Sequence, residues 1–68
     1  MNKQAYNPDE ILTVEEVAAW LRVKPEWVRA HANGNRRPKL PSFKMGRALK
    51  FRRKDIEQFI EELVHLAA

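Results

Sequence analysis

Two short helical segments joined by only three residues are the feature that most constrains how this chain can fold. The first helix is predicted to begin at Thr13, which has Glu16 three residues later in the capping-box pattern. The second is predicted to begin with Pro25, a residue favoured at the first helical position, and to end before Gly34. Because the link at 22–24 is so short, the two helices must cross steeply.

Each helical segment has an apolar side and a polar side. In the first helix, the repeat at i, i+3, i+4 and i+7 predicts a buried stripe of Val14, Val17, Ala18 and Leu21. In the second segment, residues 24–33, the packing side contains Trp27, Val28, His31 and Ala32. The outward side contains Glu26, Arg29, Ala30 and Asn33. One face can pack while the other binds a ligand, and the spacing is that of a helix-turn-helix.

Residues 41–52 are predicted to form a β-hairpin, because apolar and basic residues alternate on both sides of Gly46. The alternation is expected to direct one set of side chains toward the helices, namely Phe43, Leu49, Phe51 and, with them, Met45. The set expected to point outward, with Arg47 at the tip, is Lys44, Lys50 and Arg52. The hairpin would be a wing with a basic outer surface. Residues 35–41, with two prolines and three basic residues, predict a basic loop before it.

A third helical repeat begins at about Lys54 and predicts a packing helix. Its apolar stripe is Ile56, Phe59, Ile60, Leu63 and Val64. Its other face is acidic, which disfavours contact with DNA, and consists of Glu57, Gln58, Glu61 and Glu62. Residues 1–10 lack periodicity and are expected to form a flexible arm, so the folded domain is expected to span residues 11–66.

Positive charge is concentrated in the middle of the chain. Residues 22–54 contain twelve Lys and Arg residues and one acidic residue, Glu26, whereas the flanks contain one Lys and eight acidic residues. A block of net charge +11 beside flanks of net charge −7 is the pattern expected of a surface that binds a polyanion. A solubilising surface is the alternative, but solubility favours mixed signs over segregation.

The residue inventory argues against catalysis and metal binding. The sequence has no Cys and only two His residues, His31 and His65, so it offers no thiolate ligands and no His cluster. It contains no plausible nucleophile–base pair, and neither an enzymatic activity nor a cofactor is expected. Residues 1–10 lack the basic and apolar regions of a signal peptide, and no apolar run is long enough to span a membrane. A cytoplasmic protein without a membrane partner is therefore expected.

Three stretches of the sequence carry a family resemblance. They are LTVEEVAAWLRV in the first helix and turn, Val28 in the second helix, and KMGRALKFRRKDIEQFI in the wing and last helix. On these residues the chain, from about 12 to 63, resembles the small winged helix-turn-helix proteins of the excisionase and AlpA type, relatives of the MerR DNA-binding domain. The resemblance implies a mostly α fold with a small β-hairpin. The chain departs from the family pattern at Arg22, where Gly is common, at Lys24, at Ala30, and in a longer loop at 33–38.

In such proteins the second helix enters the major groove of DNA and the wing contacts the backbone or the minor groove. By position, the resemblance implies base or groove contacts from Glu26, Arg29 and Asn33. The phosphate contacts that it implies are Lys24, Lys44, Arg47 and Lys50, with Arg36 and Arg37 from the loop and Arg52 from the wing. Side-chain chemistry agrees, because Arg suits guanine, Asn suits adenine and Lys suits phosphate. Two alternatives stay open. Glu26 could be present only because an acidic side chain in the first turn stabilises the helix dipole, and Asn33 could be a helix-end cap.

We therefore expect sequence-specific binding of double-stranded DNA by an excisionase-type architectural factor of recombination, associated with the nucleoid. A small transcriptional regulator that uses the same surface is the alternative. An integrase or recombinase, or neighbouring protomers on DNA, would be its protein partners, and a monomer is expected in free solution because both apolar stripes are needed for the core. A module that binds RNA or an acidic protein is an alternative of a different class. The expected burial of Phe43 and Phe51 argues against RNA, which needs exposed stacking platforms.

Overall fold

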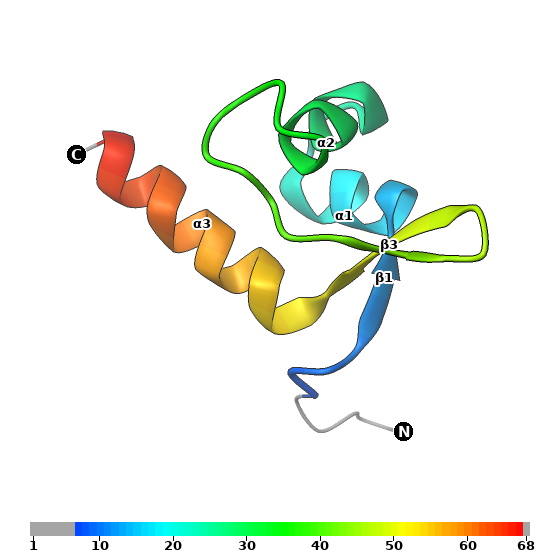
Figure 1. The fold of residues 1–68 in the computed structure, drawn as a ribbon. Coiled ribbons are helices and arrows are strands. Elements are labelled where there is room, and N and C mark those ends of the chain that lie inside the picture. Colours follow the sequence, from blue (N-terminus) through cyan, green and yellow to red (C-terminus); the bar gives the residue numbers. More distant parts are fainter. Residues whose placement is uncertain (1–6, 68) are drawn as a thin grey trace.

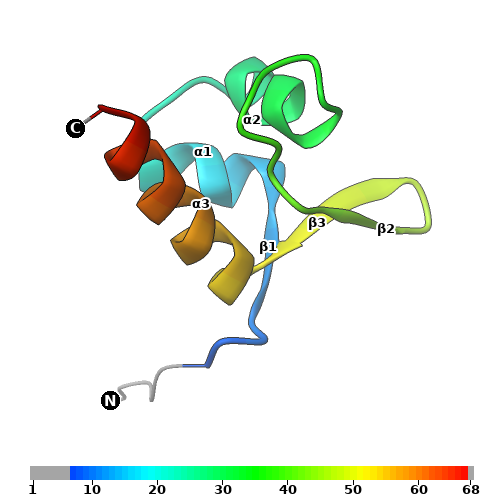
Figure 2. The same ribbon diagram turned by 60° about the vertical axis from the view of Figure 1, so that its left-hand side comes forward.

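The computed structural model describes residues 7–67 and contains three helices and a small antiparallel sheet (Figure 1). The elements in chain order are β1 (Ile11–Thr13), α1 (Val14–Leu21), α2 (Pro25–Ala32), β2 (Phe43–Met45), β3 (Ala48–Arg52) and α3 (Arg53–Ala67). The hairpin of β2 and β3 and the far end of α3 point to opposite sides of the molecule (Figures 1 and 2). This is the mostly α, winged helix-turn-helix architecture that the sequence predicted. None of the described helices is long and apolar enough to cross a membrane.

The helices α1 and α2 begin at the positions that the capping residues predicted. Thr13 Oγ1 accepts a hydrogen bond from the backbone N–H of Glu16 (3.0 Å), and the Glu16 carboxylate accepts one from the backbone N–H of Thr13 (2.8 Å), which completes the capping box. Pro25 occupies the first turn of α2, and Gly34 beyond it has φ +87°. Arg22 ends α1 in the left-handed conformation (φ 60°, ψ 46°), which costs a residue with a Cβ atom about 1 kcal/mol.

A third strand, β1, was not predicted from the sequence. It pairs antiparallel with β3, with Leu12 opposite Phe51, so β3 becomes the central strand in the order β1-β3-β2. Three residues are too few to show the alternation by which a strand is recognised.

The residues before β1 are hydrogen-bonded to the start of α3. The backbone N–H of Lys54 donates to the carbonyl of Pro8 (3.0 Å), and that of Arg53 donates to the carbonyl of Glu10 (2.9 Å). These bonds satisfy two of the N–H groups that a helix leaves free in its first turn. Residues 7–10 of the predicted arm are thus attached to the domain, and residues 1–6 lie outside the described residues.

The core lies between the helices and the inner face of the sheet. Its buried apolar members are Val14, Val17, Ala18, Val28, Ala32, Leu40, Phe51, Ile56 and Phe59. Leu40 was not predicted to belong to it, because it stands between basic residues and prolines in the loop. Its backbone N–H donates to the carbonyl of His31 (3.0 Å), so the loop returns to α2 and inserts this side chain into the core.

His31 is buried, in agreement with its predicted place on the packing side of the second helix. Its ring lies 4.1 Å from that of Trp27 and 5.2 Å from that of Phe59, measured between centroids. Its Nδ1 lies 2.8 Å from the carbonyl oxygen of Pro38, in hydrogen-bond contact. His31 therefore joins α2 to α3 and to the loop.

The wing is present, but two of its side chains do not point inward as predicted. Residues 46–47 form the turn, which sets Met45 opposite Ala48 and Phe43 opposite Lys50. Residues directly opposite each other in an antiparallel pair share a face, so Phe43 and Met45 lie on the outer face with Lys50. Their exposed fractions, 37% and 54%, agree with this.

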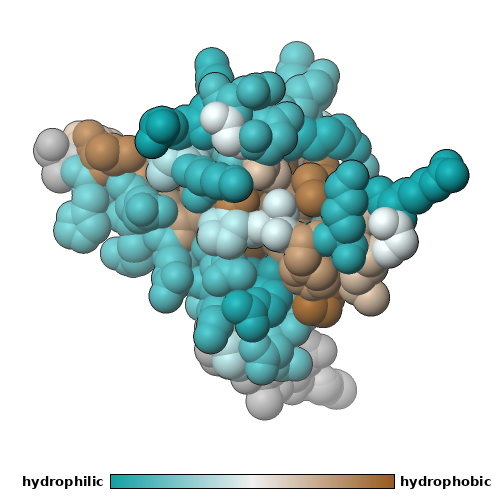
Figure 3. All heavy atoms as spheres, in the orientation of Figure 1, coloured by the Kyte–Doolittle hydropathy of each residue, from teal (hydrophilic) through white to brown (hydrophobic). Residues whose placement is uncertain are grey.

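The same register places Lys44 on the inner face of the sheet. Lys44 stands opposite Leu49, on the face that Leu49 shares with the buried Phe51, and the prediction that it points outward with Lys50 was wrong. Val64 was also predicted to be buried, but it is 58% exposed. Apolar side chains are therefore visible at the wing and at the C-terminal end of α3, on an otherwise hydrophilic surface (Figure 3).

Candidate nucleic-acid interface

The exposed side of α2 is a narrow polar ridge. Val28, His31 and Ala32 are buried against the core, as the periodicity predicted, whereas Glu26 and Arg29 are exposed. Asn33, just beyond the helix, is exposed as well. We call Glu26, Arg29 and Asn33 the α2 ridge.

One flank of the α2 ridge faces the wing across a groove of about 440 Å³. We call this space the wing groove. The charged residues that line it are Glu15, Arg29, Lys44, Arg47 and Lys50. Lys44 and Lys50 both line the groove, although the hairpin register places them on opposite faces of the sheet. The groove thus holds four cations and one carboxylate, between a helix and a hairpin.

The other flank of α2 borders a second groove of about 480 Å³, which we call the loop groove. Lys24 and Arg36 are the cations that line it, together with Glu26 of the ridge. Arg36 is held there because its backbone N–H donates to the carbonyl of Ala30 (3.1 Å). The α2 ridge therefore has basic side chains on both sides, from the wing and from the loop.

Most cations around α2 have no carboxylate within ion-pair distance among residues 7–67. These cations are Lys24, Arg36, Arg37, Lys44, Arg47 and Lys50. Arg29 is the exception, because its Nη2 lies 3.5 Å from Oε2 of Glu15. Unpaired cations at the rim of a groove can accept an external anion without first losing an internal partner.

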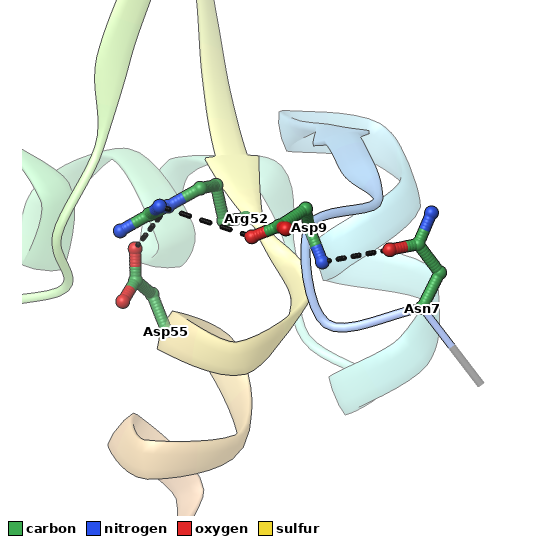
Figure 4. Close-up of polar contacts among 4 residues, drawn as sticks. All are labelled: Asn7, Asp9, Arg52 and Asp55. Carbon is green, nitrogen blue, oxygen red and sulfur yellow. Dashed lines mark hydrogen bonds and ion pairs between the residues drawn. The ribbon is translucent and has the colours of Figure 1, made fainter.

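Arg52, also predicted to contact DNA, is in a different environment. Its Nε lies 3.4 Å from the Asp55 carboxylate and its Nη1 lies 3.9 Å from that of Asp9 (Figure 4). Asp9 is positioned in turn by the bond from its backbone N–H to Oδ1 of Asn7 (3.0 Å). The structure therefore gives Arg52 two internal carboxylates and does not bring it into either groove.

Arg53, the next residue, completes this second group of charges. Its guanidinium pairs with Glu10 (2.9 Å) and Glu57 (3.6 Å) and lies 5.3 Å from the centre of the Trp20 ring. The hydrogen bond to Glu10 raises the pKa of Arg53 above its ordinary value. We call the six residues at the junction of β3 and α3 the junction cluster: Asp9, Glu10, Arg52, Arg53, Asp55 and Glu57.

The structure decides one open reading of the sequence and adds one residue that the sequence did not indicate. Asn33 is the C-cap residue of α2, and its Oδ1 accepts a hydrogen bond from the backbone N–H of Asn35 (3.0 Å), so its oxygen has a structural role. Glu15 was not predicted to be a site residue. Glu15 lies in the first turn of α1, and nothing in the spacing indicated that this turn borders α2 and the wing.

Comparison with protein families identifies the domain. A family model described as a helix-turn-helix domain matches residues 11–64, which include both helices of the motif, the wing and most of α3. Comparisons with curated proteins and with solved structures gave no match. The match supports the part of the sequence-based resemblance that places the chain among small helix-turn-helix DNA-binding proteins. The chain therefore belongs to the helix-turn-helix domain family.

Proposed function

We propose that the protein binds double-stranded DNA sequence-specifically, with α2 in the major groove and the wing on the backbone or in the minor groove. The observation that carries the proposal is the position of the α2 ridge between two grooves whose cations are mostly unpaired. The major groove of B-DNA admits an α-helix, and phosphates then lie on both sides of it. The wing groove and the loop groove would each meet one of the two phosphate strands.

The three ridge residues have side chains suited to base edges. Arg29 can present two donors to O6 and N7 of guanine, and Glu26 can accept from N4 of cytosine. Asn33 retains the amide NH₂ group for a base, because only its oxygen is used by Asn35. We assign base contacts to these three residues, with Arg29 as the principal one.

The basic residues of the two grooves are assigned to phosphates. On the wing these are Lys44, Arg47 and Lys50, and in the loop groove they are Lys24 and Arg36. Arg37, an exposed neighbour of Arg36 that lines neither groove, is assigned to a phosphate as well. Arg52 is left out of the assignment because two carboxylates already neutralise it. Phosphate contacts supply affinity and fix the register of the protein on the duplex, and base contacts supply specificity.

Within this function we propose an excisionase-type architectural role in recombination. Cations on two flanks of one helix can pull on both phosphate strands, which favours bending of the duplex around the protein. An integrase or recombinase, or neighbouring protomers on the DNA, would be the protein partners of a chain that is monomeric in free solution. Gel mobility of circularly permuted duplexes that carry the selected site tests the role. A bound but unbent duplex would favour a transcriptional regulator.

Selection from a random duplex library, followed by binding to the selected duplex, to a shuffled duplex and to RNA of equal length, tests the function itself. RNA is included because Phe43 is exposed, which weakens the argument against it made from the sequence. Arg29→Ala should cost about 1–3 kcal/mol on the selected duplex and much less on the shuffled one. Equal losses on both duplexes would remove Arg29 from the base-reading role, and preference for RNA would overturn the proposal.

The wing is tested by the salt dependence of binding. Removing both Lys44 and Arg47 should weaken selected and shuffled duplexes alike and reduce the slope of log K against log salt by about 2, since each lost phosphate contact accounts for roughly 0.9. The single variant Lys44→Ala has a matched control in Lys54→Ala, which also removes one exposed Lys but from α3, where the residue lines neither groove. An unchanged slope in the double variant would show that the wing does not contact the backbone.

A further inference from the structure

We propose that Glu15 determines the sequence specificity of this protein, by holding Arg29 ready for a base and by disfavouring contact with phosphates. The inference rests on the proposed function, because it concerns the same DNA surface. Glu15 touches no base in this proposal. It acts through Arg29 and through the charge that it adds to the wing groove.

The geometric basis is a contact between the two helices of the motif. Nη2 of Arg29, in α2, lies 3.5 Å from Oε2 of Glu15, in the first turn of α1. Both side chains are solvent-accessible, with exposed fractions of 52% and 69%. The pair therefore sits at the open surface of the wing groove, where an incoming duplex would meet it.

Stability alone does not account for the pair. Ion pairs as exposed as this one contribute little to folding, because water and salt screen them. The N-terminus of α1 is already capped by Thr13 and Glu16, so Glu15 adds only a dipole interaction there. What the pair does change is the distribution of Arg29 rotamers, which it shifts toward those that reach Glu15.

A fixed direction matters for base recognition. A guanidinium group carries five N–H donors in one plane, and its contact with guanine requires two of them to be aimed together. Glu15 engages a single nitrogen of Arg29, so the remaining donors stay available. Because part of the side-chain entropy is lost before binding, Arg29 loses less of it when it meets the base.

The charge of Glu15 acts against non-specific binding. Among the described residues, Glu15 is the one acidic residue that lines the wing groove, beside Arg29 and three other cations. On an unrelated sequence, where Arg29 finds no matching base, the best alternative partner for its guanidinium is a phosphate. Glu15 competes for that guanidinium and repels the phosphate, so the unrelated duplex is penalised more than the matching one.

The substitution Glu15→Gln tests the role of Glu15, because it removes the negative charge and leaves the size and shape of the side chain nearly unchanged. The measurements are dissociation constants and salt slopes on the duplex selected by the wild-type protein and on its shuffled counterpart. The ratio of the two affinities should fall about tenfold, with most of the change arising from tighter binding of the shuffled duplex. Because Arg29 is then free to take a phosphate, the salt slope on the shuffled duplex should steepen by roughly 0.9. The thermal midpoint should stay within a few degrees.

Two controls separate the positioning role from a general charge effect. Glu62→Gln makes the same change on the exposed face of α3, outside both grooves, and should leave the affinity ratio unchanged. In an Arg29→Ala background, Glu15→Gln should alter the salt slope on the shuffled duplex much less, because the released guanidinium is absent and only the charge of Glu15 in the groove is lost. An equal change of slope in both backgrounds would overturn the positioning role.

The outcomes also distinguish this inference from the proposed function. If Glu15→Gln keeps the wild-type ratio and slope while Arg29→Ala and the wing variants weaken binding as expected, the role of Glu15 is wrong and the DNA surface stands. If Arg29→Ala and the wing variants leave DNA binding unchanged, the proposed function itself is wrong.

Discussion

Two groups of basic residues lie close together in this small protein, and they have opposite environments. Around α2, six of the seven interface cations assigned to DNA have no carboxylate partner among the described residues. In the junction cluster, Arg52 and Arg53 each contact two carboxylates. Lys50 and Arg52 are two residues apart on the same face of β3, and yet they belong to different groups.

The difference shows that local charge density does not identify a binding surface by itself. Paired cations hold segments of the fold together, and their charge is largely compensated. Unpaired cations repel one another and cost some stability, which an anionic ligand restores when it binds. The acidic flanks of the sequence thus have a structural use, because Asp9, Glu10, Asp55 and Glu57 compensate the charges of Arg52 and Arg53, which are not proposed to bind DNA.

The largest expected effect is unfolding of the domain, which would disrupt both groups of basic residues together. Phe59 is fully buried in α3, and its ring lies 5.9 Å from that of Trp27 in α2. Phe59→Ala should destabilise the fold by about 3–5 kcal/mol, which is most of the stability of so small a domain. The thermal midpoint measured by circular dichroism and the affinity for duplex DNA should therefore both fall. A variant that melts within two degrees of wild type would show that the core is wrongly assigned.

A matched pair of variants sharpens the contrast directly. Arg52→Gln removes a paired cation and should lower the free energy of unfolding by up to about 1 kcal/mol at low salt, with DNA affinity almost unchanged. Arg47→Gln makes the same chemical change at an unpaired cation. It should leave the unfolding free energy unchanged or slightly raised and reduce the salt slope of DNA binding by roughly 0.9.

Urea unfolding at low and high salt and duplex titrations measure both quantities on the same samples. If Arg52→Gln weakened DNA binding as much as Arg47→Gln does, the division between the junction cluster and the interface would not hold.

The smallest expected effect concerns a basic residue outside both groups. Arg22 adopts φ 60°, and Gly adopts this conformation without the steric cost that a Cβ atom imposes. After the greater entropy of the unfolded Gly-containing chain is subtracted, Arg22→Gly should stabilise the domain by roughly 0.5 kcal/mol. Chemical unfolding measures the gain, and Arg22→Ala, which keeps the strain, is the control. Equal effects of both substitutions would mean that the charge, and not the backbone, matters at this position.

The helices could be predicted from the sequence because their signals are local. Thr13 with Glu16 and the Pro25 start each act within one turn, and the periodic apolar stripes span several turns. The packing side of α2 could be predicted for the same reason. The division of the molecule into helix pair, wing and packing helix followed from these local patterns.

The remaining features depend on partners that are distant in the sequence. β1 is defined only by its pairing with β3, and the faces of β2 are set by the length of the hairpin turn, which alternation alone does not show. The site residue Glu15 was missed because its role depends on Arg29 in the other helix. Arg52 could not be separated from Lys50, because one of the two carboxylates that it contacts, Asp9, comes from the distant N-terminal segment.

The order of the strands has a consequence for synthesis on the ribosome. Within residues 7–67, β1 and β2 each pair only with β3, which is translated after both of them. The sheet therefore cannot start to form until β3 has left the exit tunnel, and until then the nascent chain exposes Leu12 and its neighbours in β1. The segment at 7–10 must wait too, since its hydrogen-bond partners are the first residues of α3. The helix pair is different, because the contacts between α1 and α2 lie within residues 14–32 and can form before β3 is translated.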